Sequence, residues 1–461
     1  MDPAQANEGS NFMMFQAVYD TLLRRMPDGE LVPMLATDWE VAEDGLSVTL
    51  TLRDDITFSD GSKFDSSVVK ANLDRFEGEN GPQAATMSAL ASVDTPDATT
   101  VVLNLEQPDP AIPLYLANVA GLMASAEALK DPMSLATMPV GTGPYTLDAA
   151  NTSVGVKYTY QRKDDYWGEP LPFATFVSVL YPDQQAMLNA LRSGQINATS
   201  FFAPAEGVEA ENAGFTYWPA ETDYQGLVIF DRAGDKIPAL GDVRVRQAIN
   251  YAIDRELLLK TFILDRGTVT TQIWGTSSAG FDKALDNRYP YDPAKAKALL
   301  AEAGYADGFD IEMPTVPQFD PTMMAAIVQM LNDVGIRATI KDIPFPEFFP
   351  GMRSGEFPLT YMRFFQPSDW QLVTQFIAPD AVWNGFGSED PTVSTLIEEL
   401  RFARGDENVG PAQELNKFIV EDAWFAPFYR TENQTFSDPS IVVVPQAEQA
   451  APSIYNFSPK K

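Results

Sequence analysis

The sequence predicts an α/β protein of two or three domains. With 461 residues, the chain is too long to form a single hydrophobic core. Segments whose apolar residues alternate like those of strands are interspersed with segments whose apolar residues recur at helical spacing. Such strand–helix–strand units are typical of mixed open sheets with helices packed on their faces.

Two strands and a helix are predicted in the N-terminal part of the chain. Residues 46–53 and 100–105 alternate between apolar and polar side chains, as half-buried strands do. The segment Phe64-Asp-Ser66 starts a helix that carries Val69 and Leu73.

The clearest helical pattern lies between Gly241 and Leu259. Asp242 stands where an N-cap belongs, because its carboxylate accepts from backbone N–H groups that a helix start leaves unpaired. Apolar residues then recur at the spacing of one buried face, at Val245, Ala248, Ile249, Ala252, Ile253 and Leu257. We interpret this segment as one amphipathic helix of the scaffold.

Two further helices are predicted from the signals at their ends. Each begins with an Asp-Pro pair and stops at a glycine: Asp292-Pro293 to Gly304, and Asp320-Pro321 to Gly335. Their predicted buried faces are Ala296, Leu299, Leu300 and Ala303 in the first, and Met324, Ile327, Val328 and Leu331 in the second. Residues 336–340 then follow as a strand.

Composition excludes several classes of function. The chain has no cysteine and no histidine, which excludes thiol chemistry, Ser-His-Asp triads and histidine-ligated zinc. There are 32 Lys and Arg against 64 Asp and Glu, a formal net charge of −32. A nucleic-acid partner is not expected, because binding phosphates needs a basic surface. We interpret the acidic surface as solubilising. No stretch approaches the ~20 continuous apolar residues of a membrane span.

Short motifs spread over nearly the whole chain resemble one protein family. They include Val18-Tyr19-Asp20, Asp28-Gly29, Asp44-Gly45, Asp60-Gly61, Gly141-Thr-Gly-Pro-Tyr145, Asp165-Tyr-Trp-Gly168, Gly194-Gln-Ile-Asn197, Asp242 to Arg255, and Ala296 to Tyr305. In this order and spacing they resemble the peptide/nickel/opine family of extracytoplasmic solute-binding proteins, which capture small molecules for ABC importers. Asn197 stands where that family has Asp.

The resemblance implies a two-lobed periplasmic-binding-protein fold. Residues 1–35, 142–231 and 429–461 would form lobe I, residues 36–141 an extra subdomain beside it, and residues 232–428 lobe II. The crossings between lobes are expected near Phe230-Asp231 and Phe428-Tyr429. Two crossing strands would make a hinge on which the lobes close around a ligand.

The resemblance also implies a location and partners. We expect a periplasmic or otherwise extracytoplasmic protein, with or without a lipid anchor, that works as a monomer with ABC permease subunits and needs no cofactor or metal. Residues 1–8 have neither a basic leader nor an apolar core. Because a family motif begins at Val18, we expect that a leader has been removed and that Met1 is an added start residue. An intact cytoplasmic protein is the alternative.

The segment from Tyr361 to Trp370 aligns with the family's cleft loop of the form Trp-x-x-Asp-x-x-Asp-Pro. In relatives that bind peptides, an acidic residue of this loop pairs with the peptide's α-ammonium group. Here that place is occupied by Gln366 or Pro367, while Asp369 matches the later Asp and Trp370 replaces the Pro. An ammonium group buried without a carboxylate partner is costly, so this departure argues against ordinary peptide recognition, unless Asp369 or another acid takes the role.

Arg363 is the residue of this loop that most suggests a ligand. A guanidinium holds a carboxylate or phosphate bidentately, although it could equally form an ion pair with one of the protein's many acids. If the segment is a strand end, Phe364 and Phe365 point to opposite faces, and Phe364 aligns with the family's cleft Trp. Further candidates from family position are Asn11, Phe12, Met13, Tyr224, Trp274, Trp383, Asn384 and Phe386.

Three classes of function compete. The first is capture of a solute for a permease. The second is a glycoside hydrolase with a carboxylate pair, since acids are the abundant catalytic group left, although no motif selects one. The third is a binding module that reports to a receptor or assists folding. Within the first class we expect a small polar solute with an acidic group. Opine-like conjugates, oligosaccharides, modified peptides, organic acids, metal chelates and ordinary oligopeptides remain alternatives.

Overall fold

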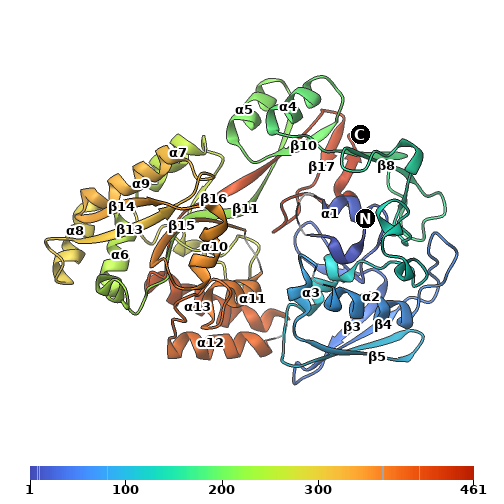
Figure 1. Cartoon of the computed structure of the whole chain (residues 1–461), viewed down its shortest axis with the longest axis horizontal. Coiled ribbons are helices and arrows are strands. Elements are labelled where there is room, and N and C mark those ends of the chain that lie inside the picture. The colour runs from blue at the N-terminus through green and yellow to red at the C-terminus, as the bar shows by residue number, and fades with distance from the viewer. Residues whose placement is uncertain (8, 10, 80, 366–367, 404) are drawn as a thin grey trace. The chain divides into compact units, whose positions relative to one another are not determined.

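The chain forms two compact units that are joined by two long strands (Figure 1). Unit 1 comprises Met1–Ala220 and Asn433–Lys461, and unit 2 comprises Glu221–Glu432. The boundaries fall inside strands β11 (Thr216–Ile229) and β16 (Phe425–Ser437), so each strand contributes to both units. This computed structural model describes residues 1–7, 9, 11–79, 81–365, 368–403 and 405–461.

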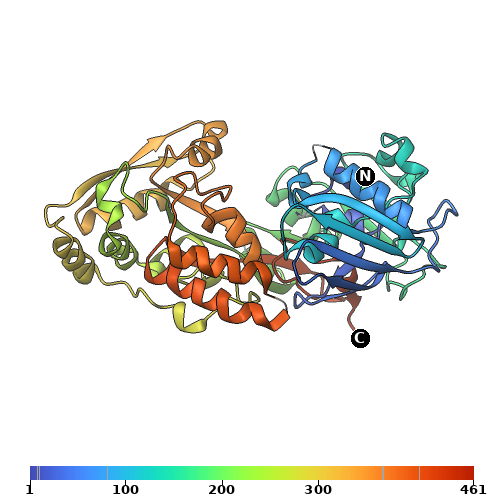
Figure 2. The same cartoon turned by 90° about the horizontal axis from the view of Figure 1, so that it is seen from below.

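Unit 1 contains a four-stranded antiparallel sheet with helix α2 (Ser66–Gly78) packed against it (Figure 2). The strand order is β3-β4-β6-β5. The strands are β3 (Ala36–Val41), β4 (Ser47–Leu52), β5 (Leu90–Asp97) and β6 (Thr100–Leu105). Alternate residues of β4 and β6 are buried, which confirms the two predicted strands. The predicted helix is confirmed: Asp65 caps α2, and its residues Val69 and Leu73 are buried.

The rest of unit 1 consists of short elements. Its helices are α1 (Phe12–Gln16), α3 (Ile112–Leu116), α4 (Gln184–Arg192) and α5 (Pro204–Asn212). Its strands are β1 (Leu23–Arg25), β2 (Leu31–Pro33), β7 (Tyr145–Leu147), β8 (Lys157–Arg162), β9 (Thr175–Val179), β10 (Ala198–Phe201), β17 (Ile441–Val443) and β18 (Phe457–Pro459). They pair as β1-β2, β7-β8-β9 and β17-β18, and β10 pairs with the part of β16 that belongs to this unit.

A buried carboxylate joins two of the sequence motifs of unit 1 to the C-terminal segment. Asp20 is 1% exposed and accepts hydrogen bonds from Tyr166 Oη at 3.0 Å, Trp167 Nε1 at 2.7 Å and Tyr455 Oη at 2.9 Å. Burial raises the pKa of Asp20, and these hydrogen bonds oppose the rise. The acid of the first motif therefore ties the Tyr166-Trp167 motif and the C-terminal segment to one point.

Unit 2 holds the remaining elements. Its helices are α6 (Val243–Ala252), α7 (Arg255–Phe262), α8 (Pro293–Glu302), α9 (Pro321–Asp333), α10 (Phe345–Arg353), α11 (Asp369–Leu372), α12 (Pro391–Phe402) and α13 (Val409–Glu421), with a π-helical turn at Val373–Ile377. Its strands are β12 (Gly267–Val269), β13 (Phe309–Thr315), β14 (Ile336–Asp342) and β15 (Leu359–Phe365), besides β11 and β16. No helix among the described residues is both long enough and apolar enough to cross a bilayer.

The strand–helix–strand prediction is confirmed in unit 2. Strands β13 and β14 pair in parallel, from Phe309 opposite Ile336 to Thr315 opposite Asp342, and α9 connects them. Asp320 caps α9 through the N–H groups of residues 322 and 323. The helix buries Met324, Ile327 and Leu331 in the core of the unit, whereas Val328 is partly buried. In α8, Ala296 and Leu300 are buried, and Leu299 and Ala303 pack against the same core.

The prediction of one helix between Gly241 and Leu259 is wrong, because the chain breaks it into α6 and α7. Ile253 has extended backbone angles, and Asp254 caps α7 by accepting from Leu257 N at 3.0 Å. The residues predicted as buried in α6 and at its end are buried, but Leu257 is 51% exposed. The new cap restarts the helical phase, so Leu258 and Leu259 face the core instead.

The polar residues of this segment fasten it to the start of β16. Arg255 is buried and donates to the carbonyl oxygens of Pro427 at 2.7 Å, Asn250 at 2.9 Å and Tyr289 at 3.0 Å. Asn250 donates to the Phe425 carbonyl at 3.0 Å. Arg246 pairs with Asp422 at 2.6 Å. These side chains satisfy backbone acceptors where the chain enters β16, which makes the segment a structural clamp.

Candidate functional site

The paired ends of β11 and β15 present charged side chains on one face and aromatic side chains on the other. The two strands are antiparallel, with Tyr224 opposite Phe364 and Asp223 opposite Phe365. Because successive side chains of a strand point to opposite faces, Asp223 and Arg363 share one face and Tyr224 and Phe364 share the other. The sequence-predicted residues Arg363, Phe364 and Tyr224 are therefore brought together, on opposite sides of the same strand pair.

The charged face carries a close ion pair. Arg363 Nη2 lies 2.5 Å and Nε 2.6 Å from Asp223 Oδ2. The Arg363 side chain is 37% exposed, whereas that of Asp223 is only 14% exposed. Burial raises the pKa of Asp223, and the charge and hydrogen bond of Arg363 work against this rise. Arg363 thus compensates a poorly hydrated carboxylate and still reaches solvent.

The aromatic face is a packed stack. The rings of Tyr224 and Phe364 have centroids 5.0 Å apart, and Phe364 meets Phe376 edge-on at 4.5 Å. Tyr224 and Phe364 are both buried, while Phe365 is exposed, which confirms the predicted alternation. The Tyr224 hydroxyl has no hydrogen-bond partner among the described residues, and burial raises its pKa.

Asp369 holds a loop in place. Its Oδ2 accepts from Ala279 N at 3.0 Å, and its Oδ1 accepts from Gly280 N at 2.9 Å. Trp274 lies against the same loop: a Cβ atom on Gly280 would come within 2.4 Å of the Trp274 Nε1 atom. Trp274 is 1% exposed, and its Nε1 has no partner among the described residues. Asp369 and Trp274 are therefore neighbours through Gly280.

Other predicted residues have clear structural surroundings. Trp370 is buried with the Arg401 guanidinium 5.2 Å from its ring centre. Trp383 packs on Phe349, with ring centroids 5.5 Å apart. The buried Asn384 side chain accepts from Arg232 Nη2 at 3.0 Å and donates to the Ala378 carbonyl at 3.0 Å. Phe386 is partly buried, with Lys236 Nζ 5.8 Å from its ring centre.

The predicted residues near the N-terminus belong to unit 1. Asn11 precedes α1, and its buried Oδ1 has no partner within the described part of the chain. Phe12 is buried and lines a cavity large enough for about one water molecule, together with Gln16, Arg24 and Tyr455. Met13 is partly buried. Gln366 and Pro367, where the sequence departs from the peptide-binding pattern, lie outside the described residues.

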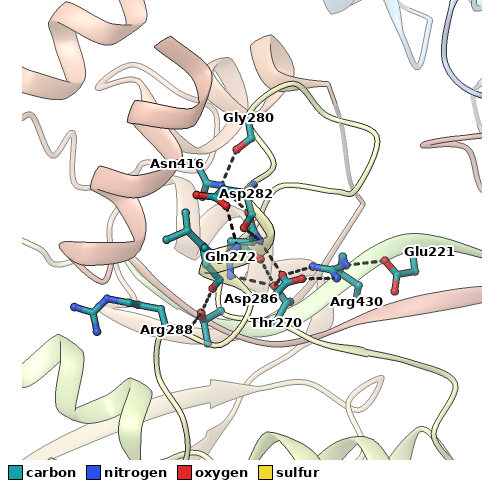
Figure 3. A network of polar contacts seen from close by, with 12 residues as sticks. Glu221, Thr270, Gln272, Gly280, Asp282, Asp286, Arg288, Asn416 and Arg430 are labelled. Carbon is teal, nitrogen blue, oxygen red and sulfur yellow. Dashed lines mark hydrogen bonds and ion pairs between the residues drawn. The ribbon is translucent and has the colours of Figure 1, made fainter. Parts of the chain in front are cut away.

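A second arginine organises a buried polar network next to this loop (Figure 3). Arg430 of β16 bonds Glu221 of β11 through Nε at 2.7 Å, and Asp286 through Nη1 at 2.7 Å. Asp286 also accepts from Thr270 at 2.9 Å and from Gln272 at 2.8 Å. Two hydrogen bonds of Asn416 extend the network: its Nδ2 donates to Gln272 Oε1 at 2.6 Å and to the Gly280 carbonyl at 2.8 Å.

The network fixes charges as well as geometry. Burial acts to raise the pKa of Asp286, but the hydrogen bonds and charge of Arg430 outweigh it and lower this pKa below its usual value. The Arg430 side chain is only 3% exposed. Arg430 therefore joins both strands that leave the unit to the loop that carries Trp274 and Gly280. In the described part of the chain, no group of three or more acidic residues is placed to hold a metal ion.

Sequence reasoning did not select Asp223, Glu221, Asp286 or Arg430. The alternation of β11 offered a signal for Asp223, since Tyr224 was selected and its neighbours must point to the opposite face. Nothing local in the sequence marks the network around Arg430, because its partners lie 144 and 209 residues away along the chain.

Comparison with known proteins assigns the family. A family model described as bacterial extracellular solute-binding proteins, family 5 (middle), matches residues 30–376, which is most of the chain. The chain belongs to this family. The peptide/nickel/opine resemblance seen in the sequence motifs is confirmed.

Individual relatives agree with this assignment. The glutathione-binding protein GsiB of Salmonella paratyphi A is 30% identical over 348 residues, which cover 74% of this chain and 66% of GsiB, just under two thirds of its length. The structure of HbpA2 from Haemophilus parasuis has a TM-score of 0.89 at 22% identity and covers 100% of this chain and 97% of its own. AgaA of A. tumefaciens R10, solved with agropinic acid, has a TM-score of 0.76 at 24% identity and covers 100% and 96%. The fold is the two-lobed α/β fold of solute-binding proteins, as predicted.

Proposed function

We propose that the protein captures a small polar solute outside the cytoplasm and delivers it to an ABC-type permease. The family match over residues 30–376 carries this proposal. It is supported by two compact units connected through β11 and β16, a connectivity suited to hinge closure on a solute. The solute is released to the permease when the units reopen.

We propose further that the solute bears an acidic group held by Arg363. The Arg363 guanidinium combines partial exposure with a fixed position, because Asp223 holds it through two hydrogen-bonding nitrogens. Glutathione and agropinic acid, named with GsiB and AgaA, are both acids. Trp383 of unit 2, which is only partly buried, is the candidate to stack on the rest of the solute, whereas Trp274 is 1% exposed and packs inside the unit.

Asp369 is a poor partner for a peptide's ammonium group, since both its oxygens already hold backbone amides of the loop at Ala279 and Gly280. This use of Asp369 supports a solute other than an ordinary peptide bound through that acid. A peptide whose ammonium group is bound by a different acid is the alternative that the ligand screen tests.

A thermal-shift screen tests the proposal. The panel contains organic acids, opines, glutathione, dipeptides, longer peptides and oligosaccharides, and mass spectrometry identifies any solute that co-purifies. A ligand at ~100 times its dissociation constant adds about 2.7 kcal/mol of stability, which moves the unfolding midpoint by several degrees. Binding of an organic acid, an opine or glutathione supports the proposal. Binding of ordinary peptides alone would keep solute capture but contradict the proposed class of solute. The absence of any hit and of any co-purified solute would count against solute capture.

A further inference from the structure

We propose that Asp223 and Arg363 together recognise a zwitterionic α-amino-acid group, with Arg363 taking the carboxylate and Asp223 the ammonium. The inference rests on the proposed function and names the class of its solute. The solute is then an amino-acid derivative with a free amine beside a carboxylate, rather than a simple organic acid.

The first support comes from the difference between two arginine–aspartate pairs of the same unit. The Arg430 side chain is only 3% exposed and pairs with two carboxylates, those of Glu221 and Asp286. Arg363 makes equally short contacts to Asp223 but keeps a side chain that is 37% exposed. The two pairs differ in their arginines and not in their acids, since the Asp223 side chain is 14% exposed and that of Asp286 is 19% exposed. An arginine that is held by an acid and still reaches solvent is suited to receive a charge from outside, whereas the buried Arg430 is suited to hold the fold.

The second support is the effect on Asp223 of a ligand that carries only negative charge. Such a ligand draws the guanidinium away from a carboxylate that is only 14% exposed. A poorly hydrated charge that loses its partner is strongly unfavourable. A zwitterion avoids this outcome, because its ammonium replaces at Asp223 the positive charge that its carboxylate withdraws at Arg363.

The surrounding charge favours a neutral head group for the same reason. The whole chain carries a formal net charge of −32. A zwitterion adds no net charge to this acidic environment, whereas an anion adds one.

Geometry supplies the third support. The two charges of an α-amino acid are attached to one carbon atom, so they are as close together as the groups of a contact ion pair. Asp223 and Arg363 are held at that spacing by neighbouring strands, and the Tyr224–Phe364 stack fills the opposite face. In the proposed complex, the Arg363 guanidinium, the ligand carboxylate, the ligand ammonium and the Asp223 carboxylate form a ring in which positive and negative charges alternate. Glutathione has such a head at its γ-glutamyl end, which makes it a suitable probe.

Calorimetric titration of the whole protein tests the inference from the ligand side. The probes are glutathione and γ-glutamylglycine, each with its N-acetyl derivative, which keeps every carboxylate but loses the ammonium. We expect the parent compounds to bind and N-acetylation to weaken binding by about tenfold or more, as for loss of one member of a buried charge pair. Equal affinity of parent and N-acetyl derivative overturns the inference, as does equally tight binding of glutarate. This comparison uses the native protein and does not depend on any variant.

A variant adds an independent test. Asp223→Asn should weaken the parent compounds about tenfold and leave the N-acetyl derivatives bound at least as tightly as in the wild type, because no buried carboxylate then loses its partner. The preference for the amine should therefore disappear. The matched control is Asp310→Asn, which removes the acid of an exposed pair with Arg337 in the same unit and should leave all affinities unchanged. Retention of the full preference in Asp223→Asn contradicts the role of Asp223.

The outcomes separate this inference from the proposed function. If none of the amino-acid derivatives binds but another solute of the thermal-shift panel does, the zwitterion site is wrong and solute capture stands. If no solute binds and none co-purifies, the proposed function itself fails.

Discussion

At the scale of single residues, Arg363 shows how far a role depends on the partner that the fold supplies. The sequence left ligand anchor and ion pair as equal alternatives. The structure shows the ion pair with Asp223 and leaves the Arg363 side chain 37% exposed, and the role of ligand anchor stays a proposal. We expect Arg363→Ala to weaken binding of the cognate solute by about 2–5 kcal/mol, because a charge in a poorly hydrated pair loses its partner. Calorimetry against the solute found by screening measures this loss. A change of only a few tenths of a kcal/mol would exclude Arg363 as the anchor.

Gly280 is a second residue whose importance follows from contact distances. A Cβ atom there would lie 2.4 Å from Trp274 Nε1 and 2.9 Å from Asp369 Oδ1. We expect Gly280→Ala to lower the free energy of unfolding by about 1–3 kcal/mol, since the packed indole must move. Gly410→Ala in α13 is the matched control, because nothing lies within 4 Å of its Cβ position. Equal midpoints for the two variants in denaturant unfolding would show that the loop around Gly280 accommodates the added methyl group without loss of stability.

Those features of the candidate site that depend on neighbouring residues in the sequence were predictable from it. Period-two alternation predicted that Phe364 and Phe365 point to opposite faces, because a strand needs no distant partner to have two faces. Which of the two faces is buried was not predicted, and the structure buries Phe364 and exposes Phe365. The pairing of Arg363 with Asp223 depends on the register between β11 and β15, which are 140 positions apart in this contact. The two amides bound by Asp369 come from a loop about as remote, at a separation of 89 and 90 residues. Such contacts are set by tertiary structure, so a single sequence does not show them.

At the scale of elements, the break between α6 and α7 was missed because the helical pattern was extended through Asp254, the residue at which a second helix starts. Asp254 follows apolar residues at helical spacing, yet aspartate is also a strong N-cap. Its carboxylate binds Leu257 N and starts α7 in a new phase. The Asp-Pro starts of α8 and α9 were predicted correctly. At both starts the capping aspartate is followed by a proline, which a helix accepts in its first turn but not further along.

The clamp made by Arg255 gives a prediction for these elements. Arg255→Met should destabilise unit 2 by about 3 kcal/mol or more, since several buried carbonyl groups would lose their donor at once. Arg255→Lys should recover only part of this loss, because an ammonium cannot match the fork of donors that a guanidinium offers. Thermal unfolding of both variants measures the effect, with the exposed Arg337→Met as control. A midpoint of Arg255→Met like that of the control would show that the carbonyl groups find other partners.

The Arg430 network predicts a dependence of stability on pH. The pKa of Asp286 is lowered in the folded protein, so its ionised form stabilises the fold above the unfolded value of 3.8. This contribution is lost as the pH falls through the lower folded pKa. The Asp286→Asn variant lacks it at every pH. Between about pH 5 and pH 2, wild type should therefore lose more free energy of unfolding than Asp286→Asn does, as followed by denaturant titrations. Parallel curves for the two proteins would contradict the role of Arg430 in holding Asp286 ionised.

At the scale of the whole molecule, the sequence was sufficient for the family and the fold because its motifs are spread over most of the chain. Several of them are structural: Asp20 ties its own motif to the Tyr166-Trp167 motif and to the C-terminal segment, and the Arg246-to-Arg255 segment fastens β16. The position of the hinge stays a prediction. Phe230 directly follows β11, and Phe428 and Tyr429 lie within β16. Motion about such points depends on free-energy differences between open and closed states, which neither a motif nor a contact reports.

Solute capture by closure predicts that a saturating solute makes the molecule more compact in solution. For a chain of 461 residues, a single compact body has a radius of gyration of about 23 Å. Small-angle scattering of the solute-free protein should give a larger radius, and addition of the solute should move it toward this value. The Arg363→Ala variant at the same solute concentration is the control for binding, and a non-binding acid of equal charge is the control for ionic effects. An unchanged radius in protein shown by calorimetry to be saturated would mean that the solute is held without closure. Recognition would then rest on the partly exposed Arg363 and its partner Asp223 in unit 2 alone.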